Sequence, residues 1–435
     1  MSGTADILEL SEEAVAPRLG PVSPQSAAML TPQREPPWRP TPAPNATSLP
    51  PSRQGSPYSV PASVPPHAPA VLAIDLDALR TNYRALNSIA GQARCAGVIK
   101  ADGYGLGLEP VMKALLSEGC RTFFVATLDE AWRARQVAPA PATAEIYVLG
   151  GLFPGSAPGF ADLRARPVLN SLAELREWSQ FCATNFTRLP AAMHIDTGMS
   201  RLGLPAAEVD ALSAEAALFH SFELTLIMSH LACADEPGHV KNVGQRQQFE
   251  AMRQRLPAAP ASLANSAAML LGPAYHYDLT RPGIALYGGA ALSRVPNPMK
   301  PVVRLLARIL QVRDLVPGDT VGYGAAFETR RAARIATLAL GYADGYSRHL
   351  SGTTQQPGPI ALIGGYPAPI VGRISMDLIT LDVTDVPAEL VQRGTFAELI
   401  GSYVKIDDIA ERSGTIGYEV LTRLGRRAWR VYLGQ

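Results

Sequence analysis

The stretch Val-Ile-Lys-Ala-Asp-Gly-Tyr-Gly-Leu-Gly at residues 98–107 contains the side chain with the clearest chemical potential, Lys100. An apolar run at residues 96–99 leads to this lysine and glycines follow it, so we expect Lys100 at the end of a buried strand, before a sharp turn. Burial lowers the pKa of an amine, which favours Schiff-base chemistry with an aldehyde such as pyridoxal phosphate. The alternative is a lysine whose stem covers apolar surface while its head reaches water.

Further residues capable of chemistry follow other predicted strands, or lie in glycine-rich turns later in the chain. Each of them alone is commonly a surface arginine, a packed histidine or an aromatic residue in a turn, so only the complete set is informative. The members are His194, Arg201, Ser229, His230, Asn265, Ser266, Arg281, Tyr323, Tyr342, Arg373 and Met376.

Alternating strand and helix signals place these residues in a barrel. Active-site residues of a (β/α)8 TIM-type barrel lie at the carboxyl ends of its strands, where most of this set falls. An open doubly wound sheet is the alternative, but no G-x-G-x-x-G follows a strand to support its dinucleotide-binding form. The predicted strands are residues 70–75, 97–100, 122–126, 146–149, 167–169, 191–195, 224–229 and 260–264, with 284–287 closing the series.

After about residue 303 the helical rhythm fades, and short segments rich in β-branched residues predict a mostly β domain. We therefore expect a barrel domain over residues 70–302 and a C-terminal β domain over residues 303–435. One helix is predicted at residues 406–412. The predicted strands of this domain are residues 305–312, 334–340, 360–363, 370–374, 378–383 and 396–400.

Residues 1–69 differ in composition from the rest of the chain. They hold 16 of the 38 prolines, mixed with Ser, Ala, Thr and Gln, so they cannot bury enough apolar surface to offset the entropy of ordering. We expect a disordered or polyproline-like tail. No basic region precedes an apolar stretch, so a signal peptide is not expected.

Charge and cysteine content exclude several classes of partner. Lys plus Arg total 39 and Asp plus Glu total 38, so the net charge of +1 gives no reason to expect nucleic acid or an anionic membrane as a partner. No apolar run is long enough to span a bilayer. Four cysteines without metal-binding spacing indicate free thiols, no metal site and a cytoplasmic location: Cys95, Cys120, Cys182 and Cys233.

Four motifs together resemble the alanine racemases of the fold-type III pyridoxal phosphate class, over essentially all of residues 70–435. They are V-I-K-A-D-G-Y-G-L-G, D-T-G-M-S-R-L-G, R-P-G-I-A-L-Y-G and G-R-I-S-M-D. The resemblance implies a barrel with a C-terminal β domain and pyridoxal 5′-phosphate as cofactor. It also implies a homodimer with shared active sites that interconverts L- and D-alanine and supplies D-alanine for peptidoglycan.

The same resemblance assigns two bases. Lys100 is similar to the lysine that carries the cofactor and acts on one face of the substrate carbon. Tyr323 is similar to the base for the opposite face, contributed by the other subunit. A base on each side allows a proton to leave one face and return on the other. A hydrogen-bonded chain from Tyr323 through His230 to Arg281 is implied to stabilise the tyrosine anion, since a tyrosine of pKa near 10 is otherwise a poor base.

Arg281 is implied to face the pyridine nitrogen of the cofactor, where a guanidinium keeps its proton and so leaves the ring largely neutral. The cofactor phosphate is implied to bind Tyr104, Ser266 and the backbone N–H groups of Gly283 and Ile284, because glycine allows the main chain close to an oxyanion.

Substrate contacts are implied for Arg201 and for the backbone N–H of Met376, and Tyr342 with Arg373 resembles part of the entry corridor. Many relatives carry a carbamylated lysine seven residues before the arginine, which it braces. Here that position is His194, so no carbamylated lysine is expected, and His194 itself or a bound anion must orient Arg201.

Three other functions compete. A broad-specificity racemase acting on serine, lysine or arginine would share nearly every residue named. A fold-type III decarboxylase pairs the pyridine nitrogen with a carboxylate, which Arg281 argues against. A non-catalytic pyridoxal-phosphate-binding protein would keep Lys100 and the phosphate site but lack the β domain that carries Tyr323.

Overall fold

The computed structural model describes residues 63–140, 143–212, 214–356 and 358–435. The expectation of a disordered tail concerns residues that lie, except for 63–69, outside this described part.

Seven parallel strands form a curved sheet in chain order from β3 to β9. The strands β2 and β10 pair in parallel beside it, and backbone N–H groups of Asp278 and Arg281 donate to the carbonyls of Ala261 and Ala264 at 3.0 and 2.8 Å. Because β2 and β3 are consecutive, these bonds link the two ends of the curved sheet into a barrel. Its strands are β2 (Arg94–Cys95), β3 (Gly97–Val98), β4 (Thr122–Val125), β5 (Glu145–Val148), β6 (Arg166–Leu169), β7 (Pro190–His194), β8 (Glu223–Met228), β9 (Ala261–Ser262) and β10 (Leu279–Thr280).

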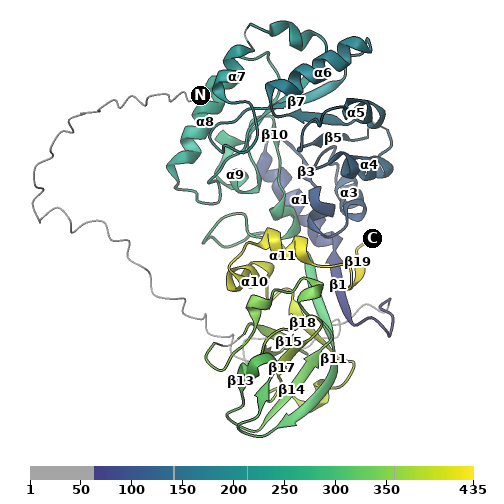
Figure 1. The fold of residues 1–435 in the computed structure, drawn as a ribbon, viewed down its shortest axis with the longest axis vertical. Coiled ribbons are helices and arrows are strands. Elements are labelled where there is room, and N and C mark those ends of the chain that lie inside the picture. The colour runs from purple at the N-terminus through teal and green to yellow at the C-terminus, as the bar shows by residue number, and fades with distance from the viewer. Residues whose placement is uncertain (1–62, 141–142, 213, 357) are drawn as a thin grey trace, which may run out of the picture. The chain divides into compact units, whose positions relative to one another are not determined.

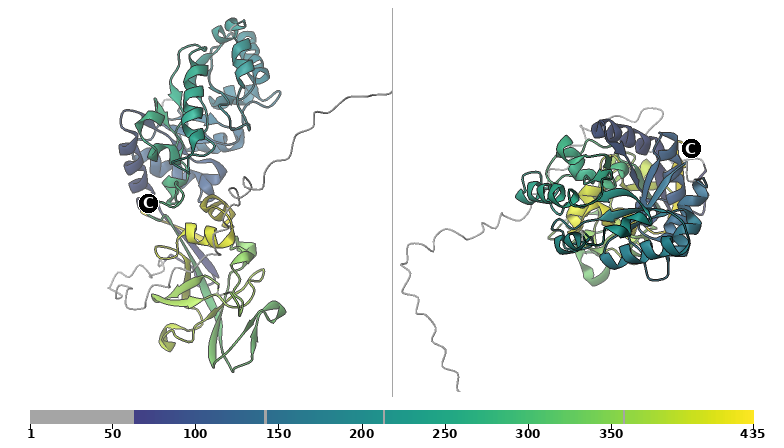
Figure 2. Two further views of the ribbon diagram at one scale, coloured as in Figure 1. Left: turned by 90° about the vertical axis from the view of Figure 1, so that its left-hand side faces the viewer. Right: turned by 90° about the horizontal axis from the view of Figure 1, so that it is seen from above.

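Helices between the strands form an outer layer, visible when the ribbon is seen from above (Figure 2). Several begin at polar cap residues: Thr127, Ser171 and Asn265 each accept a backbone N–H three residues later. The helices of this region are α1 (Leu76–Ala90), α2 (Lys100–Tyr104), α3 (Leu108–Ser117), α4 (Leu128–Val137), α5 (Ala157–Leu163), α6 (Leu172–Thr184), α7 (Ala206–Ala211), α8 (Val240–Arg253) and α9 (Ser266–Leu270).

The first predicted strand was assigned to the wrong sheet. Residues Ala70–Asp75 do form a strand, β1, but it pairs antiparallel with β11 (Val303–Leu315) and parallel with β19 (Trp429–Leu433), away from the barrel strands (Figure 1). A strand buried on both faces has the same apolar sequence in either sheet, so its composition could not decide its partners. The expected barrel domain of residues 70–302 therefore gives its first strand to the β domain.

The strand expected at residues 284–287 is also wrong. Ile284–Tyr287 form a 3-10 helix, η4, and β10 (Leu279–Thr280) supplies the last barrel strand just before Arg281. The chain turns at Gly283, whose backbone N–H donates to the Ser266 hydroxyl at 2.8 Å. An apolar run of four residues does not distinguish a buried strand from a buried helical turn.

The C-terminal region is mostly β, as predicted, and contains an eight-stranded sheet. Residues 370–374, expected as a strand, form only two isolated bridges, from Ile370 to Leu381 and from Gly372 to Gly352. The helix α10 (Ile406–Ser413) matches its prediction, whereas α11 (Gly417–Arg423) was not foreseen. The remaining strands are β12 (Thr320–Val321), β13 (Phe327–Glu328), β14 (Ala333–Leu338), β15 (Ile360–Ile363), β16 (Tyr366–Pro369), β17 (Ile379–Asp382) and β18 (Phe396–Ile400).

Within the described ranges, none of the helices has both the length and the apolar character needed to cross a bilayer. The four cysteines are free, three of them buried and Cys233 partly exposed.

Candidate active site

A cavity of about 650 Å³ lies at the carboxyl ends of the barrel strands, a volume suited to a small ligand with a cofactor. Ten of the residues predicted from the sequence line it together, from β3 around the barrel to η4. They are Lys100, Tyr104, His194, Arg201, His230, Asn265, Ser266, Arg281, Gly283 and Ile284.

Lys100 lies two residues after the end of β3, close to the strand end that its apolar run predicts, and its side chain lines the cavity. Burial lowers the pKa of its amine, and the positive charge of Arg201 lowers that pKa further, against a smaller opposing effect from Glu130. The amine is therefore more easily deprotonated than an ordinary lysine, which suits a base that also bonds to an aldehyde.

The backbone after Lys100 makes a left-handed turn. Ala101, Asp102, Gly103 and Tyr104 have φ of 54°, 57°, 63° and 54°. Only glycine adopts this region without steric cost, and each other residue there costs on the order of 1–2 kcal/mol. Such a turn persists only when its surroundings hold it.

Side chains from α3 and α4 hold this turn. The backbone N–H of Asp102 donates to Glu130 at 3.0 Å, and its carboxylate accepts from Arg133 at 2.5 Å. Arg133 also donates to both carboxylate oxygens of Glu109 at 2.7 Å, and the pKa of Glu109 is lowered by this hydrogen bond. These contacts form a brace that connects α3 and α4 to Asp102, two residues after Lys100.

Removing Arg133 should loosen the turn. Arg133→Met is expected to lower the free energy of unfolding by about 2 kcal/mol, because two charged hydrogen-bonded contacts are lost. The thermal unfolding midpoint should fall and cofactor affinity should weaken. Arg176→Met, which breaks the exposed pair with Glu215, is the control and should change the midpoint little. Equal midpoints for the two variants would contradict the brace.

Polar groups suited to an oxyanion converge at one end of the cavity. The Ser266 hydroxyl accepts the backbone N–H groups of Gly283 and Ala285 at 2.8 and 3.3 Å. Tyr104 stacks on Tyr287 with ring centroids 4.5 Å apart, and its hydroxyl lies so near Gly283 that any side chain there would collide with it. Hydroxyl and N–H groups around a glycine fit a phosphate, so the residues present suit the phosphate end of pyridoxal phosphate.

Arg281 is only 4% exposed, and its guanidinium donates to the Ser262 hydroxyl and, at 2.7 Å, to the Ser229 carbonyl. Burial lowers its pKa to about 9, which still leaves it charged at neutral pH. Its hydrogen-bond partners in the described chain are neutral oxygen atoms. The guanidinium therefore keeps its charge and its protons, as predicted for the group that faces the ring nitrogen of the cofactor.

His230 lies near Arg281 in the same cavity. Burial, followed by the charges of Arg281 and Arg201, lowers the pKa of His230 well below its ordinary value, so the imidazole is neutral. Tyr323, the third member of the predicted chain, does not line this cavity.

His194 also lines the cavity and is buried. Burial first, and then the charge of Arg281, lowers its pKa from 6.5 to about 4, partly opposed by Asp196. A lysine is absent from this position, and the side chain that replaces it is a neutral imidazole at pH 7.

His194 should make the folded protein less stable as the pH falls. Between its ordinary pKa of 6.5 and its folded pKa of about 4, the unfolded chain protonates this ring and the folded chain does not. The associated stabilisation, on the order of 3 kcal/mol, is complete above pH 6.5 and is lost as the pH falls toward 4. Thermal unfolding of His194→Gln should depend less on pH over this window. An unchanged pH dependence would show that the folded ring titrates normally.

Four predicted residues, Tyr323, Tyr342, Arg373 and Met376, lie outside the cavity at exposed positions of the β domain. Tyr323 is 69% exposed between β12 and β13, Met376 is 54% exposed and Tyr342 is 40% exposed. The backbone N–H of Tyr342 donates to the Ser375 carbonyl at 3.0 Å, so the turns of Tyr342 and Met376 lie together. Within this single chain, Tyr323 and Lys100 do not line the same cavity.

Sequence reasoning missed several residues of the cavity. Tyr418 and Ile416, at the start of the unforeseen helix α11, line it opposite the barrel strands. Phe124, on β4, lies under the Arg281 guanidinium at 5.9 Å from its ring centroid. The apolar strand pattern identified Phe124 as core but carried no sign that it faced the cavity.

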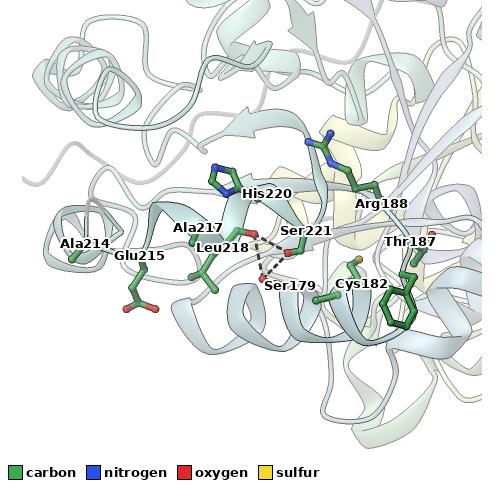
Figure 3. A pocket seen from close by; sticks show the side chains of 12 residues that line it. Ser179, Cys182, Thr187, Arg188, Ala214, Glu215, Ala217, Leu218, His220 and Ser221 are labelled. Carbon is green, nitrogen blue, oxygen red and sulfur yellow. Dashed lines mark hydrogen bonds between the residues drawn. The ribbon is translucent and has the colours of Figure 1, made fainter.

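A second cavity, of about 870 Å³, lies between α6 and η2 (Ala216–His220) and is more open to solvent (Figure 3). The hydroxyls of Ser179 and Ser221 bond to each other at 2.7 Å there. It contains none of the predicted site residues. In the described part of the chain, no cluster of His, Cys, Asp or Glu could hold a metal ion.

Comparison with known proteins matches both regions. Residues 74–291 match the family described as "Alanine racemase, N-terminal domain" and residues 302–432 the family "Alanine racemase, C-terminal domain". An alanine racemase of Methylobacterium sp. (strain 4-46) is 50% identical over 85% of this chain and 98% of its own length. A catabolic alanine racemase of Mesorhizobium japonicum is 46% identical over 84% of this chain and 94% of its own length.

Among solved structures, the chain is similar to the alanine racemase of Bartonella henselae with covalently bound pyridoxal phosphate. The TM-score is 0.79 and the identity 38%, over 84% of this chain and 100% of that one.

Proposed function

The chain belongs to the alanine racemase family, and from this premise we propose that Lys100 and Tyr323 are the two bases with which it interconverts L- and D-alanine. The observation that carries the assignment is the convergence of Lys100, Arg281 and the Ser266–Gly283 cradle in one cavity. Its cofactor is pyridoxal 5′-phosphate, as in the Bartonella structure.

Bound pyridoxal 5′-phosphate withdraws electrons from the substrate's α-carbon, which makes the α-proton removable. The chain's residues supply the rest. Lys100 would hold the cofactor and, with its lowered pKa, would hold or accept a proton on one face of that carbon. Tyr323 of a second copy does the same on the other face.

Positioning falls to the remaining residues. Tyr104, Ser266, Gly283 and Ile284 hold the phosphate. Arg281 and His230 position the cofactor ring. Arg201, Met376 and Tyr342 contact the substrate.

We place the second copy in a homodimer with shared active sites. Tyr323, Tyr342 and Met376 are exposed and do not line the cavity of their own chain, and Ile416, which does line it, is 60% exposed as well. Exposed apolar and aromatic side chains of this kind are typical of an interface. The free cysteines favour a cytoplasmic location.

The direct test uses purified protein loaded with pyridoxal 5′-phosphate. With L-alanine in deuterated water, optical rotation should fall to zero while the α-proton is replaced by deuterium. Retained rotation would contradict the function. Kinetic constants for serine, lysine and arginine then measure how strictly the enzyme selects alanine, and a broad-specificity racemase would show comparable kcat/KM values.

Whether D-alanine made by this enzyme enters peptidoglycan is tested in a cell. The gene should support growth of a D-alanine auxotroph without added D-alanine. Failure to do so, with active purified enzyme, would favour a catabolic role.

Arg281→Glu should increase side transamination. A guanidinium keeps its proton, so the facing ring nitrogen stays neutral and withdraws electrons weakly, which favours return of the proton to the same carbon. A carboxylic acid can protonate that nitrogen. Pyruvate released per racemisation turnover should therefore rise about tenfold or more, in line with a change of at least 1.4 kcal/mol between the two outcomes. Unchanged partitioning would remove this role from Arg281.

A further inference from the structure

The side-chain amide of Asn170, directly after β6, has a fixed orientation. Its Nδ2 donates to the Val168 carbonyl at 2.8 Å and more weakly to the Leu149 carbonyl at 3.4 Å. Turning the amide over would place oxygen against oxygen at both contacts. The backbone of Gly151 packs closely against this amide, because a Cβ atom added at Gly151 would lie 2.6 Å from Asn170 Nδ2.

This orientation determines the tautomer of His194. The Oδ1 atom of Asn170 can only accept, and it lies 2.9 Å from His194 Nδ1. Nδ1 must therefore carry the proton, and in the neutral ring Nε2 is left with a free lone pair. Asn170 does not line the cavity but His194 does, so Asn170 supports the ring from behind.

The loop that carries Arg201 begins and ends on His194. The backbone N–H of Leu204 donates to the His194 carbonyl at 2.8 Å. Asp196 accepts the N–H groups of Gly198 and Met199 at 2.9 Å, which closes the loop between the two ends. Gly203, with φ of 104°, lies against the His194 ring. A Cβ atom added at this glycine would lie 3.2 Å from the ring.

Within the described part of the chain, the Arg201 guanidinium makes neither a hydrogen bond nor an ion pair with another side chain. The other cavity guanidinium, Arg281, already donates to Ser262 and Ser229. We propose that His194 is a positioning residue that offers its Nε2 lone pair to Arg201, and that Asn170 is required because it sets the tautomer. This proposal rests on the proposed function, in which Arg201 receives the substrate carboxylate.

The tautomer is measured directly by nitrogen NMR of the full-length, cofactor-loaded protein labelled at histidine. The His194 signals are those that disappear in His194→Phe. The wild type should show a proton on Nδ1 and a bare Nε2. In Asn170→Leu, which keeps the volume but has no acceptor, the proton should move to Nε2 in a substantial fraction of the molecules.

Kinetics report whether the tautomer acts on Arg201. The KM for L-alanine should rise about tenfold in Asn170→Leu and in His194→Phe, with a smaller change in kcat, because a hydrogen bond to a charged group is lost. The double variant should be no worse than His194→Phe alone, since both changes remove one interaction. His194→Gln, whose amide oxygen can accept from Arg201, should recover part of the loss. Asn185→Leu, at the exposed end of α6, is the matched control and should leave KM unchanged.

A proton on Nε2 in the wild type would overturn the proposal, as would additive effects in the double variant or an unchanged KM in His194→Phe. These results leave the proposed function standing if the wild type racemises alanine. A wild type that does not racemise alanine removes the function instead, while the NMR measurement still decides the tautomer.

Discussion

Lys100→Ala is expected to lower kcat for alanine racemisation by at least about 10⁴-fold, because both the proposed bond to the cofactor and one of the two proposed bases are lost. The visible absorbance of the lysine-bound cofactor should disappear as well. Lys100 follows a strand and lines an existing cavity, so the fold should tolerate the change.

The measurement pairs racemisation with an absorbance spectrum and a thermal unfolding curve. Lys113→Ala, an exposed lysine on α3, is the control and should behave as the wild type. Residual activity in Lys100→Ala within about tenfold of the wild type would exclude Lys100 as a base, since general-base catalysis alone contributes 10²-fold or more.

Tyr323→Phe is expected to lower kcat by about 10²- to 10⁴-fold with no change in stability, because the ring is 69% exposed and only the hydroxyl is removed. The cofactor spectrum should be normal. Tyr366→Phe, another exposed tyrosine of the β domain, is the control.

The two faces of the substrate should respond differently in Tyr323→Phe. With Lys100 intact, one enantiomer of alanine should still exchange its α-proton with deuterated solvent without inverting. Exchange of the other enantiomer should slow by the same factor as kcat. Equal slowing of exchange for both enantiomers would contradict a separate base on each face.

The sequence predicted the cavity better than it predicted the strands around it. Lys100 and His230 were located because an apolar run followed by a polar residue marks a strand end, and strand ends meet at one rim of a barrel. Arg281 was singled out through the motif R-P-G-I-A-L-Y-G, and it lines the same cavity. That argument survives a wrong assignment of the first strand, since β1 carries no residue of the cavity.

Other features could not be predicted because they depend on contacts between distant parts of the chain. The left-handed turn after Lys100 includes Ala101 and Tyr104, which have no local preference for positive φ, and Arg133, some 30 residues later, helps to hold it. Tyr418 reaches the cavity only through the placement of α11, which its own short sequence did not indicate.

The site also remains incomplete in a single chain. Tyr323 and Lys100 share no cavity here, so the two-base proposal requires a second copy of the chain to bring them together. Glycines on both sides explain the exposed turn itself: Gly322 and Gly324 have φ of 79° and 68°, and Arg373 packs against both.

Subunit complementation tests most directly whether one active site is built from Lys100 of one chain and Tyr323 of another. Co-expression of Lys100→Ala and Tyr323→Phe chains in equal amounts should give half mixed dimers, each with one intact site, and so about a quarter of wild-type activity for an isologous pair. Each variant alone should be inactive on this scale. Mixed dimers without activity would contradict the shared site.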